Sequence, residues 1–515
     1  MRIDFLPYGP VDGVTRLSRD LLEGRSPGFP PAGETCATRL EEIVRRAGTL
    51  PAPSADRARI AEAACAYQER IGAPSEAGDA ARLLTEARAA VVAAGQGPGL
   101  LGGPAMAVYK GLSAALLCRR LARIDPSRTW IPVYWNASQD HDAGEHDAAH
   151  VAVGGEVRTL RAGIATGGHP LETVVPGTLA GRVVEAFLAL LPNDEARGRA
   201  RAVCEPGSPE VAWGEWTSRI LTRLLGRFGL VVVEPRIWDG PARPLLARAA
   251  AQAADIEGRI ASRSQEIQAA GYEPSVGAAP CRVFGVFPSG RRRLAPLEAL
   301  PMRLSPDVLL RPVVQGALLP VAAQVSGPSE IAYGVQATAL FEALGVAAPV
   351  LVPRMSLTLV DGRMERVMRQ FRLTAQECAS PDADAGAIAR PFVDPSLAAD
   401  LSTAREAVDG GIGRIEERAL GIDPALERAF RKGRARIERE MERLGERAAE
   451  ASLRERGHDP GQLRFLFSMF RPGGKPQERV LNYLSLWACR DADLTDAIAS
   501  AADPMEARHQ VLFLD

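Results

Sequence analysis

The chain has 515 residues, which is too long for one hydrophobic core and predicts two or three structural units. Its 62 Lys and Arg residues balance 63 Asp and Glu residues, so no basic excess indicates a nucleic acid partner. Apolar residues make up 46% and no run of about 18 apolar residues occurs, so we expect a soluble globular protein without a membrane span.

The first 90 residues carry helical patterns rich in Ala and Arg, such as Thr38 to Ala47 and Asp56 to Ile71. They predict an N-terminal helical segment that joins the core. From residue 91 to about residue 400, short apolar runs alternate with helical stretches. The runs are Val91-Val92, Ile131 to Trp135, Leu230 to Val233, Cys281 to Phe287 and Pro349 to Val352. The helical stretches are Pro104 to Leu121, Pro209 to Phe228, Leu245 to Ala270 and Pro328 to Leu344. This alternation predicts an α/β class, with a doubly wound parallel-sheet core and inserted connecting segments.

Residues 401–490 have a different composition, which is rich in Arg, Glu and Ala between Pro424 and Gly457. Phe430, Ile437 and Leu444 fall seven residues apart, which is a heptad pattern of about three repeats. A long helix is expected here. It either dimerises as a coiled coil or packs in a hairpin against a helix near residues 401–420, and the sequence leaves both open. Residues 491–515 are expected to return to the core.

The seven cysteines lie singly and far apart, with no Cys-x-x-Cys pair. Scattered unpaired thiols are typical of a reducing compartment. The N-terminal segment Met1 to Pro7 contains no apolar stretch long enough for a signal peptide. We therefore expect a cytoplasmic protein.

A glycine-rich segment, Gly95 to Pro104, leads from a predicted strand into the helix that carries Tyr109 and Lys110. Glycines let the backbone approach a ligand, and Pro104 suits the first turn of a helix, where free N–H groups attract anions. The spacing matches neither a Walker A loop nor a GxGxxG fingerprint. Ligand contact is favoured over a plain strand–helix connection.

The segment Trp135 to Asp147 follows the predicted strand Ile131 to Tyr134, where ligands bind in such folds. It holds His141 among the carboxylates of Asp140, Asp142 and Glu145. Carboxylates beside an imidazole can orient it as a general base for a nucleophilic amine. The same group could ligate a divalent metal, or form a solvated acidic loop that caps a helix. A polar catalytic or binding site is favoured, and no metal is assigned.

Three later segments predict anion contacts. Arg311 follows a strand-like run and precedes Gln315, and its guanidinium could hold a carboxylate bidentately. Gly327-Pro328 opens an apolar helix that carries Glu330 and Tyr333 on one face. Arg354 follows the apolar run Pro349 to Val352.

These segments together resemble the BshC family of cysteine-adding enzymes that form bacillithiol. Pro132 to Glu145 is similar to the family's motif around Asp140-His141-Asp142, and Gly327 to Tyr333 resembles a later block. Similarity extends through Leu309 to Gln315, Pro349 to Met355 and Pro476 to Arg479. The sequence departs from the family pattern at Gly97, where Gln is usual, at Gln139, where Glu is usual, and at Asp147-Ala148.

The resemblance implies a Rossmann-like core and a C-terminal coiled coil that forms a homodimer. It implies a ligase that joins the carboxyl group of cysteine to the amine of glucosaminyl-malate. In this hypothesis His141, held by Asp140 or Asp142, deprotonates the amine, with Glu145 as an alternative base, and Arg311 and Arg354 hold carboxylates. The full set of expected substrate-binding residues is Gln96, Gly99, Gly102, Gly103, Pro104, Tyr109, Lys110, Trp135, Arg311, Gln315, Gly327, Pro328, Glu330, Tyr333 and Arg354.

An amide does not form from a free carboxylate without activation, for which a nucleotide such as ATP is the usual co-reactant. The sequence contains no recognised triphosphate-binding motif, so the cofactor is left open. Two other classes of function remain as alternatives. A metal-dependent hydrolase could use the cluster around His141, and a non-catalytic coiled-coil interaction protein would need only the C-terminal third.

Overall fold

The computed structural model describes residues 1–7, 14–25, 36–51, 55–296, 298–381, 385–490 and 493–514. The chain divides into two units, one formed by Met1–Asp361 with Lys475–Asp515 and the other by Gly362–Gly474. None of the described helices is long and apolar enough to cross a membrane.

A five-stranded parallel sheet forms the centre of the first unit, in the strand order β11-β10-β2-β3-β6. Its strands are β2 (Ala89–Gln96), β3 (Thr129–Asn136), β6 (Val231–Val233), β10 (Val321–Ser326) and β11 (Val350–Pro353). The chain fills one side of β2 with β3 and β6, and then crosses to the other side with β10 and β11. This is the Rossmann order, and its topological switch point lies between β2 and β10, where such folds bind ligands.

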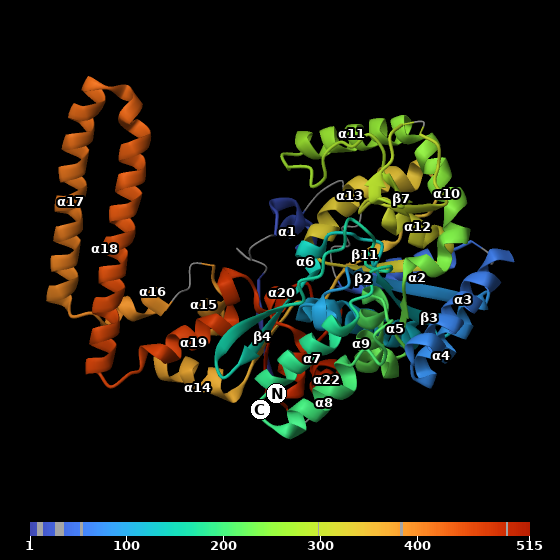
Figure 1. Cartoon of the computed structure of the whole chain (residues 1–515), viewed down its shortest axis with the longest axis horizontal. Helices are drawn as coiled ribbons and strands as arrows, with labels where there is room; N and C mark the ends of the chain where they lie inside the picture. The colour runs from blue at the N-terminus through green and yellow to red at the C-terminus, as the bar shows by residue number, and fades with distance from the viewer. Residues whose placement is uncertain are drawn as a thin grey trace. The chain divides into compact units, whose positions relative to one another are not determined.

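Side chains of β2 alternate between two cores. Ala90, Val92 and Ala94 join one cluster of buried apolar residues, and Ala89, Val91 and Ala93 join the other. On the first face pack α2 (Cys36–Gly48), α5 (Ala105–Ile124) and α9 (Trp213–Leu225). On the second face pack α10 (Asp239–Ala251), α12 (Arg311–Leu318) and α13 (Pro328–Ala343) (Figure 1). Helices on both faces confirm the doubly wound α/β prediction.

Three smaller sheets surround this core. β1 (Arg2–Leu6), β13 (His509–Phe513) and β12 (Leu357–Val360) form one, and β4 (Ala148–Val153) pairs with β5 (Glu156–Arg161). The third contains β7 (Val283–Phe287), β8 (Gly290–Arg293) and β9 (Arg303–Pro306). The run Cys281 to Phe287 therefore forms a strand as predicted, but that strand pairs antiparallel and lies outside the central sheet.

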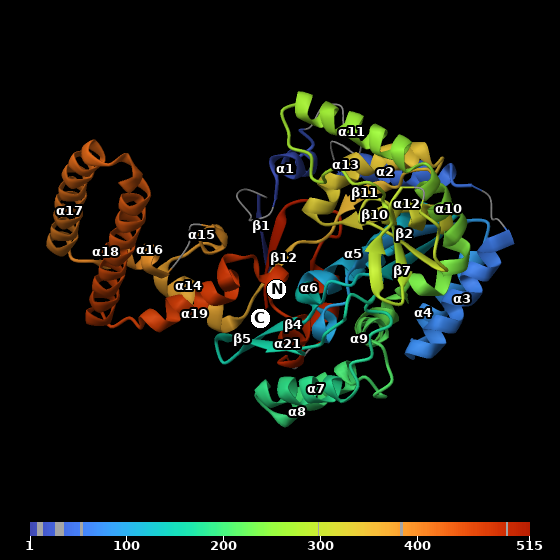
Figure 2. The same cartoon turned by 45° about the horizontal axis from the view of Figure 1, so that its top comes forward.

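The remaining helices of the first unit show two further differences. The predicted helix Leu245 to Ala270 is two helices, α10 and α11 (Ala253–Ala269), because Gln252 between them leaves the helical conformation. α11 runs beside α13 (Figures 1 and 2). Arg311, expected after a strand, instead begins α12. The other helices are α1 (Arg16–Leu22), α3 (Ala55–Ile71), α4 (Ser75–Arg82), α6 (Ala143–His146), α7 (Thr178–Leu190), α8 (Asp194–Cys204), α20 (Gln477–Val480), α21 (Tyr483–Ala488) and α22 (Leu494–Ala501).

The second unit is helical. It contains α14 (Gly362–Phe371), α15 (Ala375–Ala379), α16 (Ala385–Ala389), α17 (Pro395–Ile422), α18 (Glu427–Glu455) and α19 (Pro460–Phe470). α17 and α18 form a long antiparallel hairpin, in which Arg434 Nη2 donates to Glu416 Oε2 at 2.7 Å (Figure 1). The predicted heptad helix is α18, and it packs against the preceding helix of the same chain.

Candidate functional site

A cavity of about 550 Å³ opens between the carboxyl end of β3 and the β7–β9 sheet. Trp135 and Gln139 contribute to its wall from the β3 side, and Phe284 from β7. Asp140, His141 and Asp142 all line it, so the polar residues expected after β3 do converge on one pocket. The side chain of Glu145 lies outside the part of the chain that the structure describes.

Arg291 of β8 holds the imidazole of His141. Its Nη1 lies 3.1 Å from His141 Nδ1, while Nε donates to Ser305 Oγ at 2.8 Å and Nη2 to the carbonyl oxygen of Pro306 at 3.0 Å. The guanidinium also lies 3.8 Å from the ring centre of Phe284. Burial lowers the pKa of Arg291 to about 10, so this side chain remains a cation at neutral pH.

Asp140 accepts hydrogen bonds from the backbone of its own loop. Its Oδ1 accepts the N–H groups of His141 at 2.7 Å and of Asp142 at 3.3 Å. Burial acts to raise the pKa of this carboxyl group, but His146, these N–H groups and the charge of Arg291 outweigh it and hold the pKa below its usual value. Asp140 is therefore an ionised anchor of the loop.

Arg311 brings a cation to the same cavity. It begins α12 and lines the cavity wall. Its guanidinium makes no hydrogen bond or ion pair with any residue in the described part of the chain. A cationic fork without a protein partner is suited to bind a carboxylate bidentately.

A second polar cluster lies at the switch point, at the ends of β2 and β10. Lys110 Nζ donates to Gly95 O at 3.0 Å and to Gln96 Oε1 at 2.8 Å, and pairs with Glu330 at 2.5 Å. The Glu330 carboxylate also accepts the N–H of Gly327 at 2.6 Å, at the start of α13. Burial lowers the pKa of Lys110, and Glu330 opposes that shift. Burial also raises the pKa of Tyr333, with the charge of Glu330 acting in the same direction.

The structure brings Lys110, Gln96, Gly327, Glu330 and Tyr333 together, but none of them lines the cavity near Trp135, where they were expected to lie with His141. Arg311 lines the cavity, and its charge also acts on the pKa of both Lys110 and Glu330, so it lies near the second cluster as well. Pro328 is buried at the first turn of α13. Gln315 is buried on α12, and its Oε1 has no hydrogen-bond partner among the described residues.

The glycine-rich loop is closed by the protein itself. Gly99 and Gly103 pack against each other, and Gly102 and Gly103 both have positive φ, which glycine adopts without strain. Asn482 Nδ2 donates to Leu101 O at 2.9 Å and to Gly103 O at 2.8 Å. Pro104 forms a bridge with Asn482 and Tyr109 packs edge-on against Tyr483. These expected ligand residues hold the loop's shape and are not among the residues that line the cavity.

Gly97, one departure from the family pattern, has a steric cause. A Cβ at this position would overlap the ring of His146, which is buried against the loop. The second departure, Gln139, points its amide Nε2 toward Asp239 Oδ1 at 3.5 Å. A glutamate there would oppose the half-buried carboxylate of Asp239.

Arg354, which was expected to hold a substrate carboxylate, pairs with Glu478 instead. Its guanidinium donates to both carboxylate oxygens of Glu478, at 2.7 and 2.8 Å, and both side chains are buried. Glu478 also accepts from Ser356 Oγ and from the N–H of Leu357. Arg354 does not line the cavity with Arg311.

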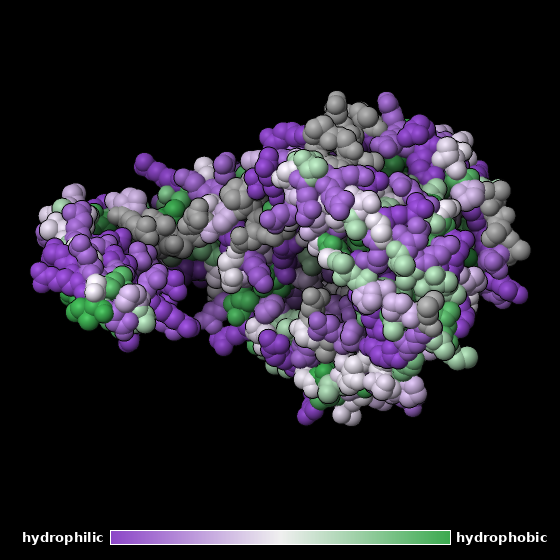
Figure 3. All heavy atoms as spheres, turned by 90° about the horizontal axis from the view of Figure 1, so that it is seen from above, coloured by the Kyte–Doolittle hydropathy of each residue, from purple (hydrophilic) through white to green (hydrophobic). Residues whose placement is uncertain are grey.

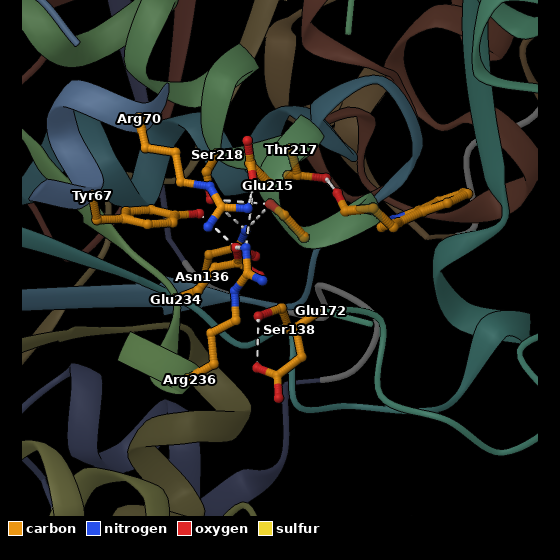
Figure 4. Close-up of polar contacts among 12 residues, drawn as sticks. Tyr67, Arg70, Asn136, Ser138, Glu172, Glu215, Thr217, Ser218, Glu234 and Arg236 are labelled. Atoms are coloured by element: carbon orange, nitrogen blue, oxygen red, sulfur yellow. Dashed lines mark hydrogen bonds and ion pairs between the residues drawn. The ribbon is translucent and has the colours of Figure 1, made fainter. Parts of the chain in front are cut away.

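A network of buried carboxylates and more exposed arginines lies beside the end of β3 and the segment that follows it (Figure 4). Glu234 Oε1 accepts from Tyr67 Oη at 2.6 Å and from Arg236 at 3.0 Å, and Glu215 pairs with Arg70 and Arg236. Asn136 Nδ2, at the end of β3, donates to Ser218 Oγ at 2.9 Å.

Glu172 and Arg303 extend this network to the cavity wall. The N–H of Glu172 donates to Ser138 O at 2.9 Å, and the N–H of Leu171 donates to Asp140 O at 2.9 Å. Arg303 bridges the carboxylates of Glu172 and Asp239. Burial raises the pKa of Glu172 to about 7.

Sequence reasoning missed Arg291, Glu172, Arg303 and Asp239. Arg291 is 150 positions from His141, and no spacing rule connects residues that meet only through the fold. The one local signal was the Arg-Arg-Arg run at 291–293, which comes one short turn after the predicted strand that became β7.

The sequence left a metal centre open as an alternative. Among the described residues, no three His, Cys, Asp or Glu side chains are arranged to hold a metal ion.

Comparison with known proteins gives matches along nearly the whole chain. The family model "Bacillithiol biosynthesis BshC, N-terminal Rossmann-like domain" matches residues 34–298 and 291–355, and "Bacillithiol biosynthesis BshC, C-terminal coiled-coil domain" matches residues 357–514. A protein of Koribacter versatilis named "Putative cysteine ligase BshC" is 30% identical over 534 residues, covering 97% of this chain and 97% of that protein.

Proteins with the same name occur in other bacteria. One of Thermus thermophilus is 30% identical and covers 94% of this chain and 97% of its own length. Another, of Geobacillus thermodenitrificans, is 25% identical and covers 98% of this chain and 99% of its own length. With both family models matched in order and full-length relatives at this identity, the chain belongs to the BshC family of bacillithiol biosynthesis.

Proposed function

We propose that this chain is a cysteine ligase that joins the carboxyl group of cysteine to the amine of glucosaminyl-malate, giving bacillithiol. The observation that carries the proposal is the match of the chain to both BshC family models, over residues 34–355 and 357–514. The relatives that align over the whole chain carry the name of a cysteine ligase.

The chemistry of the cavity supports the same function. Cysteine has a carboxylate and an ammonium group, and glucosaminyl-malate has two carboxylates and an amine. The cavity offers both signs of charge, with Arg311 for a carboxylate and Asp140 and Asp142 for an ammonium. Trp135 and Phe284 add apolar wall.

In the reaction a bond forms between the amine nitrogen and the carboxyl carbon of cysteine. One carboxyl oxygen departs with its activating group, and the attacking ammonium group loses two protons. A nucleoside triphosphate is the usual co-reactant for such activation. The residues of this chain would bind and orient the two substrates and keep the amine beside the carbonyl carbon.

Direct assay tests the proposal. Purified protein is incubated with cysteine, glucosaminyl-malate and, in parallel, ATP, GTP or no nucleotide, and the products are identified by mass spectrometry. We expect a thiol product with the summed mass of the two substrates less one water, in at least one nucleotide arm. Absence of this product in every arm would refute the ligase assignment.

Two further proposals follow from the described residues. We propose a cytoplasmic location, which is supported by the six cysteines whose side chains the structure describes, all of them free thiols.

We also propose a homodimer formed through the α17–α18 hairpin. Ile415, Ile422, Ile437 and Leu444 are exposed there, and Figure 3 shows apolar side chains at the hairpin's end among hydrophilic ones.

A further inference from the structure

Arg291 and His141 form a hydrogen bond whose donor and acceptor can be deduced. The guanidinium of Arg291 is fixed on three sides, by Ser305, by the carbonyl of Pro306 and by the ring of Phe284. Its Nη1 faces His141 Nδ1 at 3.1 Å. The backbone of His141 is held as well, because its N–H donates to Asp140 Oδ1 and its carbonyl oxygen accepts from Thr166 Oγ1.

A guanidinium has only donors, so His141 Nδ1 must be the acceptor. A neutral imidazole carries its proton on the nitrogen that does not accept, which here is Nε2. An imidazolium would set N–H against N–H and place two cations in contact. Among the described side chains, the carboxylate oxygen nearest to Nδ1 is Asp140 Oδ1 at 3.7 Å, and it already accepts two backbone N–H groups.

We propose that His141 acts on the substrate as a hydrogen-bond donor through Nε2–H, and that Arg291 is the positioning residue that fixes this tautomer. The inference rests on the ligase function proposed above and assigns His141 a role different from general base. Its ligand is an oxygen of an anionic or polarised group, such as the carboxyl oxygen of cysteine, bound in the cavity that Arg311 also lines. The proton of the amine then passes to another acceptor, for which the cavity offers Asp142.

Nitrogen-15 NMR of the full chain tests the tautomer without any assay of activity. The protein contains six histidines, so His141 is assigned by the signals that vanish in His141→Gln. At neutral pH we expect Nδ1 to resonate as an unprotonated imidazole nitrogen and Nε2 as a protonated one. A proton on Nδ1, or on both nitrogens, overturns the proposal.

Substitution of Arg291 adds a matched comparison. Arg291→Met removes the donor to Nδ1 and should let the two neutral tautomers of His141 mix. Arg292→Met is the control, because Arg292 lies next to it on β8 but pairs with Glu298 at the surface. An unchanged His141 spectrum in Arg291→Met would contradict the positioning role.

Kinetics separates a donor from a base. The side-chain amide of glutamine can place an N–H near the Nε2 position of histidine, whereas that of asparagine reaches only the Nδ1 position. For a donor, His141→Gln should retain kcat/KM about 10- to 100-fold above that of His141→Asn, since one hydrogen bond to a charged group is worth that much. For a general base, both variants lose activity equally, and that result would also overturn the proposal. If no ligation is found even in the unmodified protein, the proposed function fails, while the NMR result still decides the tautomer.

Discussion

Gly97 lies where the backbone of the glycine-rich loop meets the buried ring of His146. Any Cβ at this position overlaps that ring. Gly97→Ala should therefore lower the free energy of unfolding by about 1–3 kcal/mol, because added volume in a packed core causes strain. Urea unfolding measures this loss. Gly78→Ala is the control, because nothing lies within 4 Å of a Cβ there and alanine favours the helix.

The steric explanation can be checked independently. His146→Ala removes the ring that Gly97 accommodates, so the cost of Gly97→Ala should largely disappear in the double variant. Equal costs with and without the ring would mean that the glycine is needed for another reason.

Arg311 and Arg354, which looked alike in the sequence, should respond in opposite ways to the same substitution. Arg354→Met leaves the buried carboxylate of Glu478 without its cation, which costs about 3–5 kcal/mol of stability. Arg311→Met removes no hydrogen bond or ion pair in the described ranges and keeps most of the aliphatic side chain, so stability should change by less than about 0.5 kcal/mol. Its KM for glucosaminyl-malate or cysteine should rise instead. Urea unfolding and steady-state kinetics of both variants measure the difference, and a destabilised Arg311→Met protein with normal KM would contradict the assignment.

At the scale of the element, β13 carries a histidine whose charge state is tied to folding. His509 is buried between Ser356 and Thr358, with Nδ1 2.7 Å from the first hydroxyl and Nε2 2.9 Å from the second. Burial is the largest influence and lowers its pKa below the usual 6.5; Glu478 opposes this shift and Arg354 adds to it.

This shift predicts how stability depends on pH. As the pH falls below about 6.5, the unfolded chain binds a proton at His509 while the folded chain does not. The stabilising contribution is therefore complete above this pH and is lost as the pH falls through the lowered folded pKa. Urea unfolding at a series of pH values should show the stability difference between the wild type and His509→Gln shrinking on the acid side. A difference independent of pH would refute the prediction.

Elements were predictable from sequence where the local pattern and the final environment agreed. β2, β3, β6 and β11 are short, largely apolar runs because both faces of a parallel sheet are buried. β10 escaped prediction because Val321–Ser326 contains two alanines and a glutamine, which give no strong strand signal. β7 was found but placed in the wrong sheet, since an apolar run does not state its pairing partner.

The candidate site was predictable in part, because its residues could be found from local patterns but their partners could not. Asp140, His141 and Asp142 were found because they directly follow a buried strand, and Arg311 was found even though it begins a helix. The partners that decide their roles come from far along the chain, as with Arg291 for His141 and Glu478 for Arg354. Only the fold distinguishes Arg311, whose guanidinium has no hydrogen-bond or ion-pair partner among the described residues, from Arg354, which is bound to a glutamate.

At the scale of the whole molecule, the hairpin of α17 and α18 leaves part of its apolar seam uncovered. Ile437 and Leu444 follow the heptad spacing on α18, yet 39% and 48% of their surfaces are exposed in the single chain. A second copy that covers these residues would bury them as a coiled-coil seam does. This is the physical basis for the proposed homodimer.

Charge placed on that seam should separate the subunits. We expect the unmodified protein to sediment as a dimer and the double variant Ile437→Glu with Leu444→Glu to sediment as a monomer, because burying two unpaired carboxylates from each subunit outweighs the association energy. Ala435→Glu on the same helix is the control, since Ala435 is exposed and off the heptad positions, and it should remain a dimer. Analytical ultracentrifugation decides the outcome, with circular dichroism to verify that the helices persist. A dimer that survives the double substitution must use another surface, and a monomeric unmodified protein removes the basis for the proposal altogether.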